Sequence, residues 1–277
     1  MPGPSSWILE RLKKNGNMKG ILKMKLFDLT EKVALVTGGN GGIGLAMSKA
    51  IGEAGATVVI AGRNEEKNSQ SIKKLESLNI KCKSLIVDVV DEVSCNQLVE
   101  NVISHFGKLN ILVNNAGTNI RKRPEEYDLD EWKGIIDTNL ISMFTCSKAS
   151  FKYFKDVGGG KIINIGSMHS LFGAPLGSAY SASKGGVVQL TKSLANAWAK
   201  DNIQVNAVLP GYIDTTLTQQ ARIDIPELQL RVEERTPVGR WGVPDDLGGI
   251  AVFLSCEGSD YITGTAIPVD GGYSING

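Results

Sequence analysis

Hydrophobic and polar positions follow two alternating patterns from residue 32 to the end of the chain. Short runs that are apolar throughout and rich in β-branched residues predict strands at 33–37, 57–61, 83–87, 111–114, 162–165, 204–209 and 266–269. Apolar residues at helical spacing predict helices near 43–54, 65–78, 91–106, 130–156, 179–200 and 245–255. Apolar strands separated by helices are typical of a parallel sheet covered on both faces. We therefore predict an α/β fold, a single doubly wound domain with a seven-stranded parallel sheet.

Two segments depart from this alternation. Residues 211–243 interrupt it between a strand and a helix, and such an insertion would lie over the strand ends, where a substrate lid belongs. Residues 1–25 hold six basic residues against Glu10 and lack the continuous apolar region of a secretory signal. We expect them to form a flexible N-terminal extension, followed by a single catalytic domain at 26–277.

Composition and charge narrow the classes of partner. The net charge of +1 gives no reason to expect a nucleic acid or an anionic membrane as a partner. No apolar stretch approaches the roughly 20 residues that cross a bilayer. The four cysteines are widely spaced and indicate reduced thiols in a cytoplasmic protein. With only two histidines besides, we expect no metal site.

The first candidate for chemistry is the pair Tyr180 and Lys184 in YSASK, which follows Ser167 by thirteen residues. Residues four apart share one face of a helix, so an ammonium would lie beside a phenol. A nearby cation lowers a tyrosine pKa, whereas burial raises it. A tyrosine with a lowered pKa is a general acid/base for a hydroxyl or carbonyl. This spacing also occurs by chance, so its weight comes from what surrounds it.

A glycine-rich turn, TGGNGGIG at 37–44, follows the first strand and opens the first helix. Gly38, Gly42 and Gly44 provide the tight turn, the close backbone approach and the helix–strand contact of a dinucleotide site. The helix N-terminus beyond them attracts a pyrophosphate. A glycine turn alone is weak evidence, but the strand–turn–helix context favours a nucleotide cofactor.

Several further motifs stand in a recognisable order, namely NNAG at 114–117, Asn139, Ser167, YSASK, PG at 210–211 and DGG at 270–272. Together with the glycine turn, they resemble the short-chain dehydrogenase/reductase family over about residues 27–277. The resemblance implies a Rossmann domain, an NAD(H) or NADP(H) cofactor and a homotetramer.

The resemblance also implies a catalytic tetrad of Asn139, Ser167, Tyr180 and Lys184. Tyr180 would exchange a proton with the substrate oxygen, and Ser167 would hydrogen-bond that oxygen. Lys184, helped by a cationic nicotinamide ring, would lower the pKa of Tyr180 and also hold the nicotinamide ribose. Asn139 would bend its helix and bind a water, although its residue type alone favours a solvated polar position.

Cofactor contacts follow from the same resemblance. Asp88 would accept a hydrogen bond from the adenine amino group, with a helix-cap role as the alternative. The NNAG turn would border the adenosine, or form only a β-turn. The implied cofactor-binding residues are Thr37, Gly38, Asn40, Gly42, Ile43, Gly44, Arg63, Asn64, Asp88, Val89, Asn115, Ala116, Gly117, Tyr180, Lys184, Pro210, Gly211, Ile213 and Thr215.

The choice of cofactor depends on the residues after the second strand. An NAD enzyme usually places Asp or Glu there, whereas this chain has Gly62 followed by Arg63. A guanidinium suits a 2′-phosphate, so NADP(H) is favoured and NAD(H) stays possible. Two points weigh against NADP(H). Many relatives that prefer it carry a basic residue where this chain has Gly41, and Arg63 could instead stack on the adenine.

Three stretches, 117–132, 196–222 and 237–255, are most similar to bacterial sugar-acid dehydrogenases of the 2-deoxy-gluconate 3-dehydrogenase and gluconate 5-dehydrogenase types. A carboxylate substrate would need arginines or backbone amides. The candidate substrate contacts are Arg121, Arg123, Arg222, His169 and Tyr212. The competing interpretations are solvated arginines and a packing role for His169. Trp241 is expected to anchor the lid.

We therefore predict an oxidoreductase that prefers NADP(H) and interconverts a secondary alcohol and a ketone on a gluconate-type sugar acid or polyol. Two alternatives remain at this point. One is a carbonyl reductase for less polar ketones. The other is a catalytically silent nucleotide-binding protein, which the complete tetrad disfavours.

Overall fold

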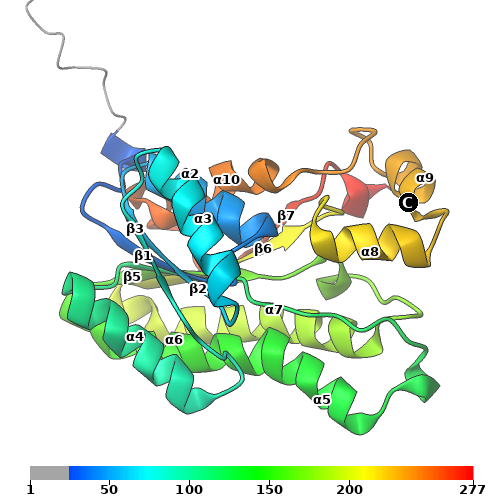
Figure 1. The fold of residues 1–277 in the computed structure, drawn as a ribbon, viewed down its shortest axis with the longest axis horizontal. Coiled ribbons are helices and arrows are strands. Elements are labelled where there is room, and N and C mark those ends of the chain that lie inside the picture. Colours follow the sequence, from blue (N-terminus) through cyan, green and yellow to red (C-terminus); the bar gives the residue numbers. More distant parts are fainter. Residues whose placement is uncertain (1–24, 277) are drawn as a thin grey trace, which may run out of the picture.

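The structure, a computed structural model, describes residues 25–276 and forms the predicted seven-stranded parallel sheet (Figure 1). Residues 1–24 of the predicted N-terminal extension lie outside the described residues. The strand order is β3-β2-β1-β4-β5-β6-β7. The strands are β1 (Val33–Thr37), β2 (Thr57–Ala61), β3 (Cys82–Leu85), β4 (Ile111–Asn114), β5 (Gly160–Ile165), β6 (Ile203–Pro210) and β7 (Ala266–Val269).

Helices cover both faces of the sheet (Figure 1). One face carries α2 (Gly42–Glu53), α3 (Glu65–Ser77) and α10 (Gly248–Ser255), and the other carries α4 (Glu92–Phe106), α6 (Ser142–Asp156) and α7 (Ser178–Trp198). Within β1, Ala34 and Val36 belong to the first core, whereas Val33 and Leu35 belong to the second. Successive strand side chains point to opposite faces, which explains why both faces of β1 are buried.

The order of the strands reverses beside β1. β2 and β3 lie on one side of it, while β4 lies on the other with Thr37 paired to Asn114 at the carboxyl ends. The loops that follow β1 and β4 therefore diverge, and such a switch point is where doubly wound sheets bind ligands. The side chain of Asn114 braces this edge by donating to Oδ1 of Asn164 at 2.8 Å.

Three predicted elements differ from the observed ones. The helix expected over 130–156 is split, because a π-helical turn at Asp137–Ile141 separates α5 (Leu129–Ile136) from α6. The helix expected over 245–255 begins with a 3₁₀ turn at Pro244–Leu247 and becomes α-helical only at Gly248. The strand expected over 83–87 instead spans Cys82–Leu85 and leaves the residues before Asp88 in a loop.

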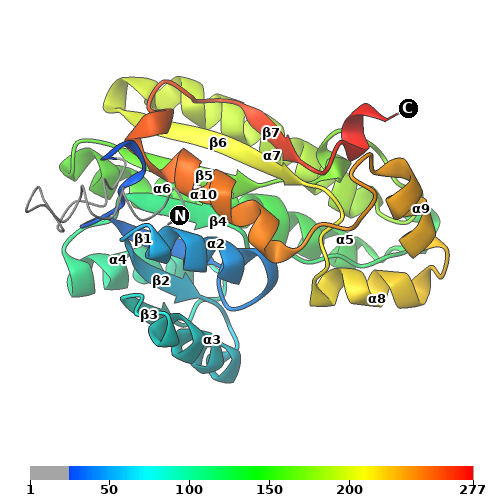
Figure 2. The same ribbon diagram turned by 90° about the horizontal axis from the view of Figure 1, so that it is seen from above.

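The segment predicted as a lid forms two helices, α8 (Thr216–Asp224) and α9 (Leu228–Arg235), beyond the carboxyl edge of the sheet (Figure 2). They share a small core of Ala221, Leu228, Val232 and Trp241. Trp241 is only 7 % exposed, as expected of an anchor. Within residues 25–276, no helix is both long enough and apolar enough to cross a membrane.

Candidate active site

The glycine turn after β1 is fastened to the turn after β4. Gly38 has φ of +63°, and a Cβ there would lie 2.9 Å from Nδ2 of Asn115. The hydroxyl of Thr37 accepts hydrogen bonds from the backbone N–H groups of Asn115 and Ala116, at 3.1 and 3.2 Å. Nδ2 of Asn115 in turn donates to the carbonyls of Thr37 and Gly38. Both turns are thus fixed relative to each other before any ligand binds.

Two adjoining cavities open above these turns. The first, of about 320 Å³, extends from the glycine turn to Ser167, Tyr180 and Lys184. The second, of about 410 Å³, is bordered by Arg63 and Asp88. Both have the size of ligand pockets. They share Gly38, Asn40, Lys67, Ala116, Gly117 and Thr118. A continuous groove therefore leads from the end of β2 to the candidate tetrad, and its extended shape fits a dinucleotide.

Most residues predicted to contact the cofactor line this groove. Thr37 and Gly44 do not, because Thr37 is buried beneath it and a Cβ at Gly44 would lie 2.4 Å from Nδ2 of Asn115. The helix-cap alternative for Asp88 is wrong, since Asp91 caps α4 by accepting from the backbone N–H groups of Val93 and Ser94.

Lys184 is almost entirely buried beneath the groove. It is 3 % exposed, and its Nζ donates to the carbonyl of Ile165 at 2.7 Å. Burial lowers the pKa of Lys184 to about 8. Its Nζ lies 5.7 Å from the centroid of the Tyr180 ring, so both side chains share one face of α7 as the spacing predicted.

Burial raises the pKa of Tyr180 above its ordinary value, while a hydrogen bond with Ser167 and the charge of Arg121 oppose that rise. Without a nucleotide, Lys184 therefore does not lower the pKa of Tyr180, and the lowering expected from Lys184 together with a cationic nicotinamide stays a prediction. The ammonium of Lys184 bonds a backbone carbonyl, and the desolvation of the phenol outweighs the charges around it.

Asn139 lies inside the π-helical turn and is fully buried, so the solvated interpretation is wrong. Its amide donates to the carbonyl of Thr118 at 2.9 Å, and its Oδ1 accepts from the N–H of Thr118 at 2.8 Å. A Cβ built on Gly117 would lie 3.3 Å from Oδ1 of Asn139 and 3.8 Å from Nζ of Lys184. No side chain at position 117 separates the two residues.

A third cavity, of about 220 Å³, adjoins the groove, and Ser167 and Tyr180 line both. The predicted substrate contacts Arg121, His169 and Tyr212 all lie in this cavity. The His169 ring packs edge-on against Tyr180 at 5.2 Å, and its Nδ1 hydrogen-bonds the hydroxyl of Ser181 at 3.0 Å. Burial, together with the charge of Arg121, lowers the pKa of His169 and favours the neutral imidazole.

Asn119 also lines this cavity. Its Oδ1 is closed off from solvent and lacks a hydrogen-bond partner within residues 25–276. An unpaired buried acceptor costs free energy, so the side chain of Asn119 is the least satisfied polar group of the cavity lining.

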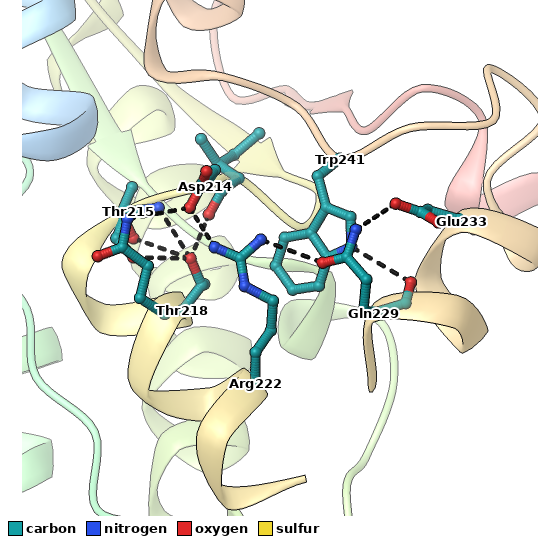
Figure 3. A network of polar contacts seen from close by, with 9 residues as sticks. Asp214, Thr215, Thr218, Arg222, Gln229, Glu233 and Trp241 are labelled. Atoms are coloured by element: carbon teal, nitrogen blue, oxygen red, sulfur yellow. Dashed lines mark hydrogen bonds and ion pairs between the residues drawn. The ribbon is translucent and has the colours of Figure 1, made fainter. Parts of the chain in front are cut away.

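Two of the predicted arginines are engaged elsewhere. Arg123 is exposed and pairs with Glu125. Arg222 lies 4.6 Å above the Trp241 ring and hydrogen-bonds Asp214 and Gln229, which ties α8 to α9 (Figure 3). Arg222 is therefore part of the packing of the two helices and does not line the cavity.

Two cationic side chains that line these cavities were not predicted from the sequence, namely Lys67 from α3 and Arg231 from α9. Lys67 follows Arg63 by four residues, and Arg231 follows the buried Leu228 by three. Helical spacing could have grouped each with its neighbour, but spacing alone gives no direction toward a cavity.

Comparison with known proteins agrees with this geometry. Residues 38–274 match the family model described as enoyl-(acyl carrier protein) reductase. The chain is 42 % identical over 251 residues to 2-dehydro-3-deoxy-D-gluconate 5-dehydrogenase of Dickeya dadantii, covering 90 % of this chain and 98 % of the relative. The chain belongs to the short-chain dehydrogenase/reductase family.

Other members of the short-chain dehydrogenase/reductase family are similar over the same length. Gluconate 5-dehydrogenase of Gluconobacter oxydans is 36 % identical, with 91 % of this chain and 98 % of that protein covered. The crystal structure of a gluconate 5-dehydrogenase from Burkholderia cenocepacia, in complex with NADP and tartrate, matches with a TM-score of 0.87 and 35 % identity, covering 91 % and 98 % of the two chains.

Proposed function

We propose that this protein is an NADP(H)-dependent oxidoreductase that interconverts a secondary alcohol and a ketone on a gluconate-type sugar acid. The observation that carries this proposal is the meeting of two cavities at Ser167 and Tyr180. A nucleotide bound in the groove and a substrate bound in the cavity would both face the hydroxyl groups of Ser167 and Tyr180.

The nicotinamide, when bound, supplies or accepts the hydride and adds positive charge in its oxidised form. Tyr180 gives a proton to the substrate oxygen during reduction and takes one during oxidation. Ser167 donates a hydrogen bond to the same oxygen and stabilises the charge that develops on it. Lys184 holds a proton beneath the groove and can bind the ribose.

Asn139 supports this proton transfer from behind. Its amide is fixed to the backbone of Thr118, and both its Oδ1 and the ammonium of Lys184 lie within 4 Å of the position that a Cβ on Gly117 would take. We propose that a water held here connects Lys184 to solvent and returns the proton after each turnover. The π-helical turn supports this role, since such turns direct side chains at functional sites.

The lining of the substrate cavity supports a polar acid as the substrate. Arg231 contributes positive charge that suits a carboxylate, and Arg121 adds a second guanidinium, which also pairs with Asp224 at 3.7 Å. His169 and Asn119, which line the cavity, are polar side chains that suit hydroxyl groups. The activities of the related gluconate and deoxygluconate dehydrogenases support the same class, as does the tartrate bound by the structural neighbour.

A substrate panel tests this proposal. Gluconate and 2-dehydro-3-deoxygluconate-type acids would be assayed with the NADP couple beside neutral polyols and hydrophobic ketones. We expect the acids to saturate the enzyme with the highest kcat/KM and Tyr180→Phe to abolish turnover. Exchanging Asn119 for the isosteric Leu should lower kcat/KM for polyhydroxy acids and not for hydrophobic ketones.

Two outcomes would contradict the proposal. A clear preference for hydrophobic ketones would identify a carbonyl reductase. Binding of NADPH without turnover of any alcohol or ketone would identify a silent nucleotide-binding protein.

We also propose a homotetramer that works in the cytoplasm. Family resemblance supports the tetramer, and the four free thiols support a reducing compartment. Sedimentation velocity of the purified protein would test the tetramer by giving about four times the chain mass of 29.7 kDa.

A further inference from the structure

Lys67 lies where the two parts of the nucleotide groove meet. Six residues line both parts, and Lys67 carries the positive charge among them. Its position on α3 is fixed by the helix cap, because the side chain of Asn64 accepts a hydrogen bond from the Lys67 backbone N–H at 2.8 Å. Arg63 precedes this cap and lines the part of the groove that follows β2.

The ammonium of Lys67 stands directly over the glycine turn. A Cβ built on Gly41 would lie 2.9 Å from both Cε and Nζ of Lys67. Gly41 has φ of 173°, an extended conformation that any residue adopts. Backbone strain therefore does not restrict position 41, and the flexible end of Lys67 occupies the volume that a longer side chain would take there.

Position 62, directly after β2, has no room for the side chain of an acidic residue. A Cβ on Gly62 would lie 2.6 Å from Nδ2 of Asn40. That amide is held in place, because it donates to Oδ1 of the buried Asn68, which in turn donates to the carbonyl of Gly62 at 2.9 Å. The carboxylate that would bind the 2′-hydroxyl of NAD(H) has no room at this position.

The two cations are available to an anion. Within residues 25–276, neither Arg63 nor Lys67 forms a salt bridge. Asp88 also lines this part of the groove, so one carboxylate faces the two positive charges. The net charge of these three side chains is positive, which favours an additional phosphate.

We propose that Lys67 is a specificity-determining residue that, together with Arg63, binds the 2′-phosphate of NADP(H). The inference rests on the proposed cofactor and deepens it, since it adds a second cation from α3 to the one expected from the sequence. A charge-assisted hydrogen bond from an ammonium to a phosphate forms with NADP(H) and has no counterpart in NAD(H).

Nucleotide titrations test the inference without any substrate. NADPH and NADH would be titrated by nicotinamide fluorescence into the full-length wild type, Lys67→Met and Arg63→Ala. Lys74→Met is the matched control, because Lys74 lies on the same helix and lines neither part of the groove. We expect Lys67→Met to weaken NADPH binding about tenfold and to change NADH binding less than about twofold. Adenosine 2′,5′-bisphosphate and 5′-AMP as competitors should repeat this difference.

Moving the charge provides a second test that does not depend on a loss of function. In Gly41→Arg/Lys67→Ala, the new guanidinium can enter the space that Lys67 leaves, on a backbone that any residue adopts. We expect this double variant to recover most of the NADPH preference that Lys67→Ala loses.

The outcomes separate this inference from the proposed function. If wild type prefers NADPH, Arg63→Ala removes the preference and Lys67→Met leaves it within about twofold of wild type, the role of Lys67 is overturned and the cofactor stands. If wild type binds neither nucleotide, or binds NADH at least as tightly as NADPH, the proposed cofactor is overturned and this inference with it.

Discussion

The ammonium of Lys184 is nearly as buried as the aliphatic core, yet its Nζ has one hydrogen bond, to the carbonyl of Ile165. Its pKa of about 8 lies below the ordinary 10.5, so the folded chain holds this proton less tightly than the unfolded chain. Below pH 8 both states carry the proton, and the full cost of burying the charge is present. Between pH 8 and 10.5, Lys184 is mostly neutral in the folded chain and still protonated in the unfolded chain. The destabilisation caused by burying its charge therefore falls over this range and is gone above pH 10.5.

Replacing this ammonium should therefore stabilise the protein while removing its activity. The difference between 10.5 and about 8 corresponds to about 3 kcal/mol. We expect Lys184→Met to raise the free energy of unfolding at pH 7 by less than this amount, because the Ile165 carbonyl loses its donor, and we expect the difference between the two proteins to change by about 3 kcal/mol as pH rises from 8 to 10.5. Urea denaturation across this pH range measures it, and Lys192→Met on the exposed side of the same helix is the control. A difference in unfolding free energy that stays constant between pH 7 and 10.5 would contradict the cost assigned to the buried ammonium.

Tyr180 gives the two directions of the reaction different pH dependences. Oxidation needs the phenolate, and burial raises the pKa of Tyr180, so the basic form increases only as pH rises. Reduction needs the protonated phenol, which dominates at neutral pH. We expect kcat/KM for alcohol oxidation to climb with pH to at least 9, and that for ketone reduction to stay level between pH 6 and 8. A falling oxidation profile would exclude Tyr180 as the base.

At the scale of elements, the sequence pattern predicted those strands and turns whose residue types are set by burial or by local backbone conformation. The strands were found because burial on both faces makes them apolar throughout, and the glycine turn because φ of +63° at Gly38 favours glycine. The apolar spacing did not locate the π-helical turn at Asp137–Ile141, because the residues on both sides of it are helical, and only the family resemblance implied a bend at Asn139. Which side of α3 and of α9 faces a cavity was not predicted either, because tertiary packing decides the orientation of a helix.

Helix α9 brings Arg231 to the substrate cavity, and this arginine should distinguish acids from neutral analogues. Removing one charge-assisted hydrogen bond to a carboxylate costs about 1.5–3 kcal/mol. We expect Arg231→Met to raise KM for a sugar acid at least tenfold, with NADPH affinity and KM for a neutral polyol unchanged. Steady-state kinetics on the acid and polyol pair measures this. An equal effect on both substrates would show that the change disturbs α9 as a whole.

At the scale of the whole molecule, the first residues that the structure describes pack against the core. Phe27 lies 6.4 Å from the ring of Phe253, and Leu29 is fully buried with its N–H bonded to the carbonyl of Ala54. The boundary near residue 25 predicted from the loss of apolar periodicity stays a prediction. The two cores on either side of the sheet, in contrast, followed directly from the sequence, because their pattern repeats along every strand.

A shortened chain would test that boundary. We expect a protein that starts at Met24 to keep the thermal midpoint and kinetic constants of the full chain, since the contacts that Phe27 and Leu29 make within residues 25–276 remain. Differential scanning calorimetry and the acid assay measure this. A fall of several degrees in the midpoint would show that residues 1–23 contribute to folding.

The wall between the nucleotide groove and the substrate cavity has a kinetic consequence. Gly211, Leu217 and Thr218 line both, so the first turn of α8 is common to the two sites. A bound nucleotide would restrain the first turn of α8 and so complete one side of the substrate cavity. A substrate that entered first would bind a cavity in which this turn is still free to move. We therefore expect a compulsory order in which nucleotide binds first and leaves last. Product inhibition by the oxidised or reduced nucleotide would then be competitive against its partner nucleotide and noncompetitive against the acid.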